Sequence, residues 1–127
     1  MKKLVMTAIA AVMLIAGVTA ALADTYLGSY VARIGENDHY ASDGYLLDTA
    51  AQMVRQDRAN FHKFGVYDAE DENDSWFGDY DTRAWLEKAL NRKSAMNNAT
   101  RKAIVNGFPL VQVDVYQNSV KVTIIGY

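Results

Sequence analysis

The chain of 127 residues contains no cysteine, which excludes disulfide bonds, thiolate catalysis and cysteine-ligated metal centres. It has no internal repeat and no low-complexity tract, and its serines stand in neither a G-x-S-x-G nor an S-x-x-K pattern. Histidine occurs only twice. The fold must therefore be stabilised by packing and polar pairing, and the sequence offers few groups that serve in catalysis.

The first 23 residues, MKKLVMTAIAAVMLIAGVTAALA, have the pattern of a secretory signal peptide. Lys2 and Lys3 form a positive n-region, an apolar h-region follows, and Ala-Leu-Ala at residues 21–23 is an A-x-A cleavage site. The alternative is an uncleaved anchor, because residues 4–23 carry no charge and about 20 apolar residues can span a bilayer. Cleavage is favoured because the second half of the segment is rich in Ala, Thr and Gly. We predict a periplasmic or secreted protein whose mature chain, residues 24–127, is a single domain.

Positive charge is in short supply. Thirteen Lys and Arg residues stand against fifteen Asp and Glu residues in the whole chain. Loss of Lys2 and Lys3 with the signal peptide leaves eleven against fifteen, a net charge of −4. A domain of that sign has no general electrostatic attraction for nucleic acid or anionic lipid. We therefore expect no nucleic-acid partner and no membrane partner after signal removal. We also expect no cofactor.

The clearest structural signal is a β-hairpin at the carboxyl end. Val111, Val113 and Val115 alternate with polar residues, Asn118-Ser119 forms a turn, and residues 120–124 alternate again. An isolated hairpin is only marginally stable and needs a third strand or a helix. Residues 26–34 read as a strand that can pair with it.

Three helices are predicted between that strand and the hairpin, each with a capping residue. They are residues 50–64 behind Thr49 and before Gly65, a helix from Asp81 to Asn91, and a helix behind Asn97 or Asn98 that ends before Gly107. The order of elements predicts an α+β domain, in which a small antiparallel sheet of the N-terminal strand and the C-terminal hairpin packs against about three helices.

The segment RQDRANFHKFG, residues 55–65, places an arginine inside an apolar helix face. At about 100° per residue, Arg58 falls between Val54 and Phe61. A guanidinium that is removed from water needs an anion or carbonyl partners. We predict that Arg58 is mostly buried and pairs with one of the seven carboxylates in residues 68–81. The alternative is a pocket arginine that binds a ligand carboxylate or phosphate.

Both histidines are candidates for catalysis. His62 lies on one shoulder of the same helix and Asp57 on the other, so His62 would need an acid from the following loop. His39 lies in NDHYASDG, with Ser42 and Asp43 close in sequence. One hypothesis is therefore a small hydrolase that uses His62 or His39 with an acid. A surface histidine or a hydrogen-bonded structural histidine is the favoured interpretation.

The acidic segment, DAEDENDSWFGDYD at residues 68–81, invites comparison with calcium sites. An EF-hand register that starts at Asp71 gives Asn73 a ligand position but puts Trp76 where glycine is required. We expect no metal. Asp71, Asn73 and Asp74 are weak candidates for an irregular oxygen site, which would make the protein a calcium-stabilised structural domain.

Aromatic residues are the remaining signal, and two of them interrupt the acidic segment. Trp76-Phe77 either forms a face for a sugar or a peptide, or pins the segment onto the core, and the second interpretation is favoured. Our main functional hypothesis is a non-catalytic binding protein whose partner is another envelope protein or a cell-wall polymer. The candidate binding residues are Arg55, Arg58, His62, Trp76 and Phe77.

The succession of RQDRANFHKFG, an acidic aromatic segment and a terminal hairpin resembles small exported bacterial proteins without an assigned activity. This resemblance covers most of the mature chain. It implies export, and it transfers no active-site residue.

Overall fold

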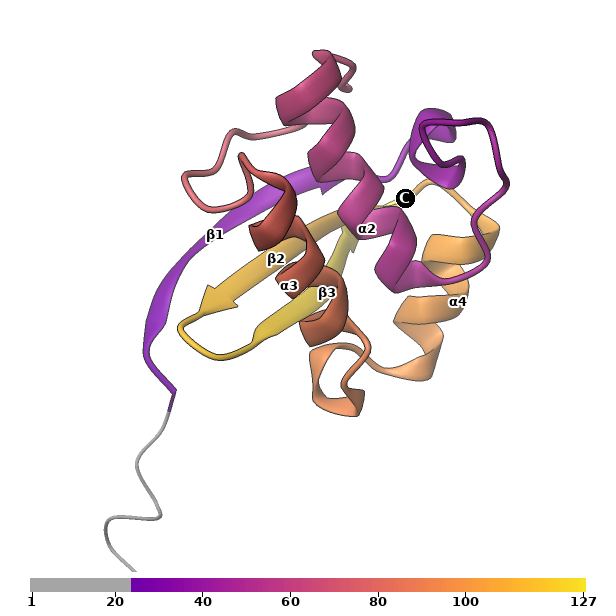
Figure 1. Ribbon diagram of the computed structural model, residues 1–127. Helices are drawn as coiled ribbons and strands as arrows, with labels where there is room; N and C mark the ends of the chain where they lie inside the picture. Colours follow the sequence, from indigo (N-terminus) through magenta and orange to yellow (C-terminus); the bar gives the residue numbers. More distant parts are fainter. Residues whose placement is uncertain (1–23) are drawn as a thin grey trace, which may run out of the picture.

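The computed structural model describes residues 24–127, and the predicted signal peptide at residues 1–23 lies outside this described part. The described residues form an α+β domain in which helices cover one face of a three-stranded antiparallel sheet (Figure 1). This is the fold class that the sequence predicts. None of the helices within residues 24–127 has the length and apolarity needed to cross a membrane.

The sheet joins the first and the last segments of the domain. Its strands are β1 (Tyr26–Arg33), β2 (Leu110–Tyr116) and β3 (Val120–Gly126), with β2 in the centre and both pairs antiparallel. Tyr30 lies opposite Val113, which lies opposite Val122, and all three are buried. The predicted hairpin and its pairing with the N-terminal strand are confirmed.

Three α-helices connect β1 to β2. They are α2 (Ala50–Ala59), α3 (Tyr80–Leu90) and α4 (Asn98–Asn106). A short turn η1 (Glu36–His39) precedes α2, and a second, η3 (Lys93–Ala95), lies between α3 and α4. Thr49 begins α2 in the predicted capping box, because its Oγ accepts the Gln52 N–H at 3.2 Å and Gln52 Oε1 accepts the Thr49 N–H at 3.2 Å. Asn97 begins α4 by accepting the Thr100 N–H at 2.8 Å.

The start of α3 differs from the prediction. Asp79 is the capping residue, in place of Asp81, because its Oδ1 accepts the N–H of Thr82 at 2.8 Å. Asp81 lies exposed in the first turn, where a carboxylate still interacts favourably with the helix dipole. Both aspartates satisfy the capping preference, so the sequence alone does not separate them.

The predicted helix at residues 50–64 changes its winding near its end. After Ala59 the chain forms a wider π-turn, η2 (Asn60–Phe64), which Gly65 ends at a φ of 66°. Asn60 is buried, and its Nδ2 donates to Asp38 Oδ1 at 2.9 Å. This tertiary contact holds the end of α2 against η1. Local sequence periodicity does not predict such a contact.

The core lies between the helices and the sheet. Its largest fully buried apolar side chains come from every layer: Tyr30, Ile34, Met53, Val54, Phe77, Leu86, Leu90, Ile104, Val111, Val113 and Val115.

The acidic segment runs along the outer edge of β1. Glu72 Oε1 accepts the Val31 N–H at 2.8 Å, and Asp71 Oδ1 accepts the Arg33 N–H at 2.7 Å. These carboxylates satisfy the strand-edge donors that a fourth strand would otherwise bind.

Candidate functional site

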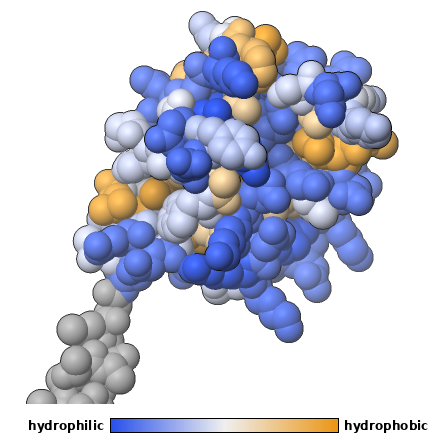
Figure 2. All heavy atoms as spheres, in the orientation of Figure 1, coloured by the Kyte–Doolittle hydropathy of each residue, from blue (hydrophilic) through white to orange (hydrophobic). Residues whose placement is uncertain are grey.

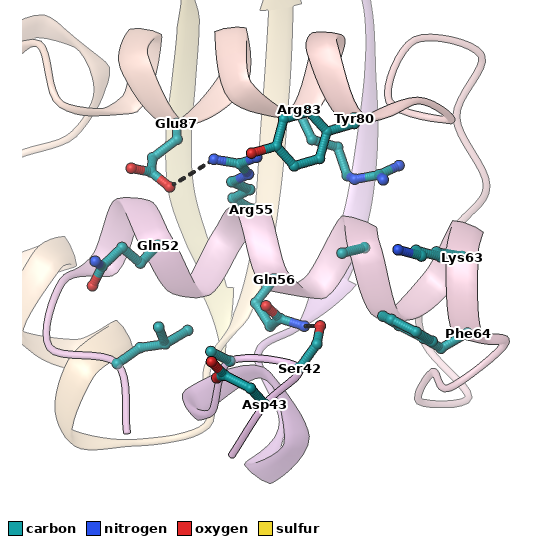
Figure 3. A pocket seen from close by; sticks show the side chains of 13 residues that line it. Ser42, Asp43, Gln52, Arg55, Gln56, Lys63, Phe64, Tyr80, Arg83 and Glu87 are labelled. Carbon is teal, nitrogen blue, oxygen red and sulfur yellow. Dashed lines mark hydrogen bonds and ion pairs between the residues drawn. The ribbon is translucent and has the colours of Figure 1, made fainter. Parts of the chain in front are cut away.

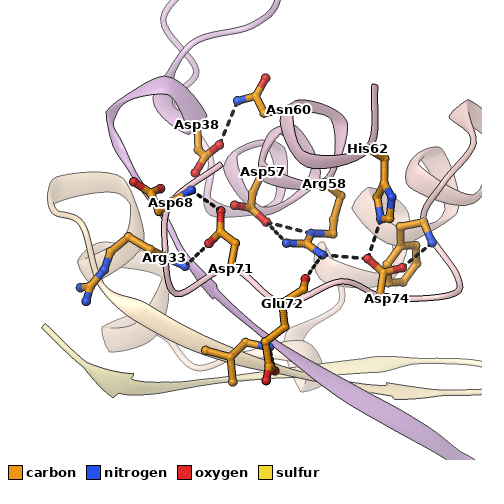
Figure 4. A network of polar contacts seen from close by, with 12 residues as sticks. Arg33, Asp38, Asp57, Arg58, Asn60, His62, Asp68, Asp71, Glu72 and Asp74 are labelled. Atoms are coloured by element: carbon orange, nitrogen blue, oxygen red, sulfur yellow. Dashed lines mark hydrogen bonds and ion pairs between the residues drawn. The ribbon is translucent and has the colours of Figure 1, made fainter. Parts of the chain in front are cut away.

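Arg58 is the centre of a buried polar network (Figure 4). Its side chain is 0% exposed, and its guanidinium lies over the rings of Tyr30 and Phe61 at 4.1 and 4.7 Å. Its Nη1 donates to Asp74 Oδ2 at 2.8 Å. Its Nε donates to Asp57 Oδ2 at 2.8 Å, and Nη2 lies 2.8 Å from the same oxygen. The prediction that Arg58 is buried against a carboxylate of the acidic segment is confirmed, and Asp57 is a second partner.

Asp74 connects most of the candidate binding residues. Its Oδ2 accepts from Arg58 and also lies 2.7 Å from His62 Nε2. Its Oδ1 accepts the backbone N–H groups of Trp76 and Phe77 at 2.9 and 2.7 Å. Burial acts to raise the pKa of Asp74, but these hydrogen bonds together outweigh it and lower the pKa. The carboxylate of Asp74 therefore joins η2 to the acidic segment.

A second group of acids lies on the other side of Arg58. Asp38 and Asp57 are both buried, and burial raises the pKa of Asp38 to about 6 in spite of hydrogen bonds from Gly35 and Asn60. Burial also raises the pKa of Asp57 well above its ordinary value, against the attraction of Arg58. Two adjacent buried carboxyls are most stable with one proton between them.

The two histidines have different surroundings. His39 is buried, with Nδ1 2.8 Å from the Gly35 carbonyl and Nε2 3.0 Å from the Ile104 carbonyl. Both ring nitrogens are therefore occupied by backbone oxygens. His62 is 13% exposed and contacts the acid Asp74, with its ring against Phe61. Of the two, His62 is the histidine that reaches both a carboxylate and solvent.

The weak metal candidates of the acidic segment bind protein donors. Asp71 accepts the Arg33 and Asp68 N–H groups, and Asn73 Oδ1 accepts the Asp74 N–H at 2.9 Å. Across residues 24–127, no three His, Cys, Asp or Glu side chains are grouped as a metal site requires. The acidic segment is held in place by hydrogen bonds to β1 and α2.

Trp76 and Phe77 are not equivalent. Phe77 is 1% exposed and packs against Tyr30 and Trp85, so the interpretation that this pair pins the segment to the core is confirmed for Phe77. Trp76 is partly buried and lines a pocket of about 340 Å³ with Trp85 and Leu27. Phe77 is therefore not accessible to a partner, whereas one face of Trp76 borders a pocket.

A larger pocket of about 510 Å³ lies between α2, α3 and the loop at residues 41–47 (Figure 3). We call it the α2–α3 pocket. Three basic side chains and two acidic side chains line it, together with aromatic and apolar groups: Arg55, Lys63, Arg83, Asp43, Glu87, Tyr80, Phe64 and Leu47. The pocket therefore carries one uncompensated positive charge on a domain whose net charge is −4.

Arg55, the predicted binding residue that Asp74 does not contact, lies in the α2–α3 pocket. Its Nη1 is 3.3 Å from Glu87 Oε1, and its guanidinium lies 5.0 Å from the centre of the Tyr80 ring (Figure 3). Glu87 therefore offsets the charge of Arg55 and fixes its position.

Arg83 is a site residue that the sequence analysis does not select. It is only 5% exposed, and its Nη1 donates to the Phe77 carbonyl at 3.1 Å. Within residues 24–127 no carboxylate lies at ion-pair distance from it. A signal for it exists, because Arg83 precedes Leu86 by three positions and Leu90 by seven, in the apolar stripe of α3.

A second pocket of about 410 Å³ adjoins the first. The two share Ala41, Ser42, Gln56 and Phe64, and the second includes Tyr40 and Val66. Gln56 Nε2 donates to Ser42 Oγ at 3.2 Å across the shared floor. We call the two pockets together the α2 groove.

The chain matches no protein-family model, and comparisons with curated proteins and with solved structures find no match either.

Proposed function

We propose that the protein is a non-catalytic binding domain of the cell envelope, exported by its first 23 residues, which holds a segment of a partner protein in the α2 groove. One observation carries this proposal. Large apolar and aromatic side chains stand exposed around the groove: Tyr40 at 44%, Phe64 at 47%, Val66 at 43% and Tyr80 at 68%. Exposed groups of this kind that surround a concave surface are typical of interaction sites.

The composition of the groove favours a protein over a polymer as the partner. Tyr, Phe and Arg are enriched at protein–protein interfaces, and Tyr and Arg are common among the residues that carry most of the binding energy. The groove presents all three types through Tyr80, Phe64, Arg55 and Arg83. The face seen in Figure 2 is mostly hydrophilic, with apolar groups in a few separate areas.

The test is capture of a partner from envelope extract with matched variants. Phe64→Ser and Tyr80→Ser remove exposed apolar groups from the groove. Ile125→Ser removes one from the solvent face of β3, where Ile125 is 49% exposed, about the same fraction as Phe64 at 47%. We expect the two groove variants to lose at least about 90% of the captured partner, since hot-spot truncation costs about 2 kcal/mol or more. Ile125→Ser should retain it. Equal capture by all variants would refute the proposal.

The export component is tested separately by fractionation and N-terminal sequencing. We expect the mature protein outside the cytoplasm, with Asp24 as its first residue. A protein that retains residues 1–23 in the membrane fraction would support the anchor alternative.

The hydrolase alternative has one supporting observation, the 2.7 Å contact between His62 and Asp74. Binding is preferred because Asp74 also accepts bonds from Arg58, Trp76 and Phe77. Its position is thus explained by the fold without a reaction.

A further inference from the structure

We propose that Arg83 anchors a carboxylate of the bound partner, so that the α2–α3 pocket takes an aspartate or glutamate side chain of an acidic peptide segment. This inference rests on the proposed function, since it names the chemistry of what the α2 groove holds. It follows from the burial of Arg83, its contacts and the charge of its surroundings.

The domain has two buried arginines, and only one of them contacts carboxylates. Arg58 is 0% exposed and has Asp57 and Asp74 within 2.8 Å. Arg83 is 5% exposed and has only the Phe77 carbonyl as a described hydrogen-bond partner. A desolvated guanidinium is stable when an anion satisfies its remaining donors. The fold supplies carboxylates to Arg58, of which Nη2 still makes no hydrogen bond, and leaves the donors of Arg83 at the wall of an open pocket.

The acids nearest to Arg83 are engaged elsewhere. Glu87 lies one helical turn further along α3 but pairs with Arg55 at 3.3 Å. Asp79 caps α3 and accepts the Thr82 N–H at 2.8 Å. Hydrogen bonds from Thr82 and, to a lesser extent, the charge of Arg83 lower the pKa of Asp79, but the side chains of Asp79 and Arg83 form no ion pair. Asp43, across the pocket, accepts a hydrogen bond from Tyr45 within its own loop. No carboxylate of residues 24–127 therefore contacts the Arg83 guanidinium directly, and an anion from outside the domain fits that place.

The charge of the pocket favours a carboxylate over a phosphate. Three bases and two acids leave a single positive charge, which one carboxylate neutralises. A phosphate group carries a charge of about −1.5 to −2 and would also approach Glu87 and Asp43. Leu47, Phe64 and Tyr80 supply apolar walls for the body of a peptide. Figure 3 shows the Arg83 guanidinium beyond the Tyr80 ring, toward Lys63.

The probes are short peptides blocked at both ends, Leu-Glu-Tyr-Leu, Leu-Gln-Tyr-Leu and Leu-phosphoserine-Tyr-Leu. Binding to the purified protein is followed by NMR, through the Arg83 Nε–Hε signal and the backbone amides of the pocket. We expect the glutamate peptide to bind at least about tenfold tighter than the glutamine peptide, a difference of about 1.4 kcal/mol. The phosphoserine peptide should bind more weakly than the glutamate peptide.

Variants test whether the preference for glutamate arises in the α2–α3 pocket. Arg83→Gln should abolish the preference for glutamate, and Arg33→Gln should leave it unchanged, because Arg33 pairs with Glu70 outside the pocket. Glu87→Gln leaves the buried arginine in place and removes an acid, so it should tighten binding of the glutamate peptide about threefold or more. Glu87→Gln therefore tests the pocket even if Arg83→Gln does not fold.

Equal binding of the glutamate and glutamine peptides by the parent protein would overturn the inference. So would tighter binding of the phosphoserine peptide, or no gain from Glu87→Gln. If capture of a partner still depends on Phe64 and Tyr80 in those cases, the proposed function stands without the carboxylate assignment. If capture does not depend on them, the proposed function itself fails.

Discussion

Arg58 shows how one residue organises the interior of this small domain. Its guanidinium touches two aromatic rings and two carboxylates, and its Nη1 also donates to the Glu72 carbonyl at 2.9 Å. Those contacts join β1, α2, η2 and the acidic segment. The charge that looks anomalous in an apolar helix face is thus a structural centre of the fold.

We predict that Arg58→Ala lowers the free energy of unfolding by about 3–5 kcal/mol, because it strands the buried Asp57 and Asp74 without their cation. Arg58→Lys should recover only part of the loss, since an ammonium group lacks the planar fork. Urea denaturation checks both. Arg33→Ala, at a 21% exposed arginine paired with Glu70, is the control and should cost under about 1 kcal/mol. An Arg58→Ala protein as stable as its parent would contradict the account.

Part of this network could be predicted from sequence. Helical phase places Arg58 among buried positions, and the seven carboxylates of residues 68–81 lie close in the chain as candidate partners. Asp57 was missed as a partner because adjacent helical positions do not face each other. Asp57 nevertheless pairs with Arg58, because the arginine side chain is long enough to fold back to the neighbouring carboxylate. Arg83 was missed because its role depends on which acids are already engaged, and that is known only from tertiary contacts.

At the scale of elements, alternation and capping residues were enough to predict the strands, the hairpin and three helices in their order. The misplaced cap at Asp81 and the π-turn at residues 60–64 have a common cause. The position of the cap and the winding of the turn each depend on which of several locally equivalent hydrogen bonds forms. At residues 60–64 the tertiary contact of Asn60 with Asp38 favours the wider winding.

The acidic segment gives a prediction at this scale. Its carboxylates already accept hydrogen bonds from β1 and from Arg58, so it needs no cation to stay in place. We expect the thermal midpoint to be the same in calcium and in a chelator, as measured by circular dichroism. An ion that binds only the native state must raise the midpoint as its concentration rises. A midpoint that climbs with calcium would instead support the calcium-stabilised alternative.

The whole molecule is acidic, and its buried charge is acidic too. Asp38 and Asp57 lie on one side of Arg58 and Asp74 on the other, with Asp71 adding its negative charge to the first pair. One buried guanidinium does not neutralise this group. Burial raises the pKa of both Asp38 and Asp57, which makes the stability of the domain depend on pH.

We predict that the free energy of unfolding falls as the pH rises from about 4 to 7. In the unfolded chain the carboxyls of Asp38 and Asp57 have the ordinary pKa of 3.8, whereas burial raises both values in the folded protein, that of Asp38 to about 6. Their contribution is thus complete below the unfolded pKa and is lost as the pH passes the folded pKa. The shift of Asp38 alone corresponds to a loss on the order of 3 kcal/mol, since one pKa unit corresponds to about 1.4 kcal/mol. Asp74 has the opposite effect, because its pKa is lowered in the folded protein. Its contribution to the free energy of unfolding is present near neutral pH and is lost as the pH falls below about 4.

Asp57→Asn is the variant that isolates this effect. An amide at position 57 offers an oxygen to Arg58 and an N–H to Asp38, as the protonated acid does, without a group that titrates. Urea denaturation across the pH range should therefore give a flatter curve, with the variant gaining on its parent toward pH 7. Glu36→Gln, at an exposed acid on η1, should leave the parent slope unchanged. A parent protein that becomes more stable between pH 4 and 7, or an Asp57→Asn protein with the parent slope, would show that this pair does not set the pH dependence.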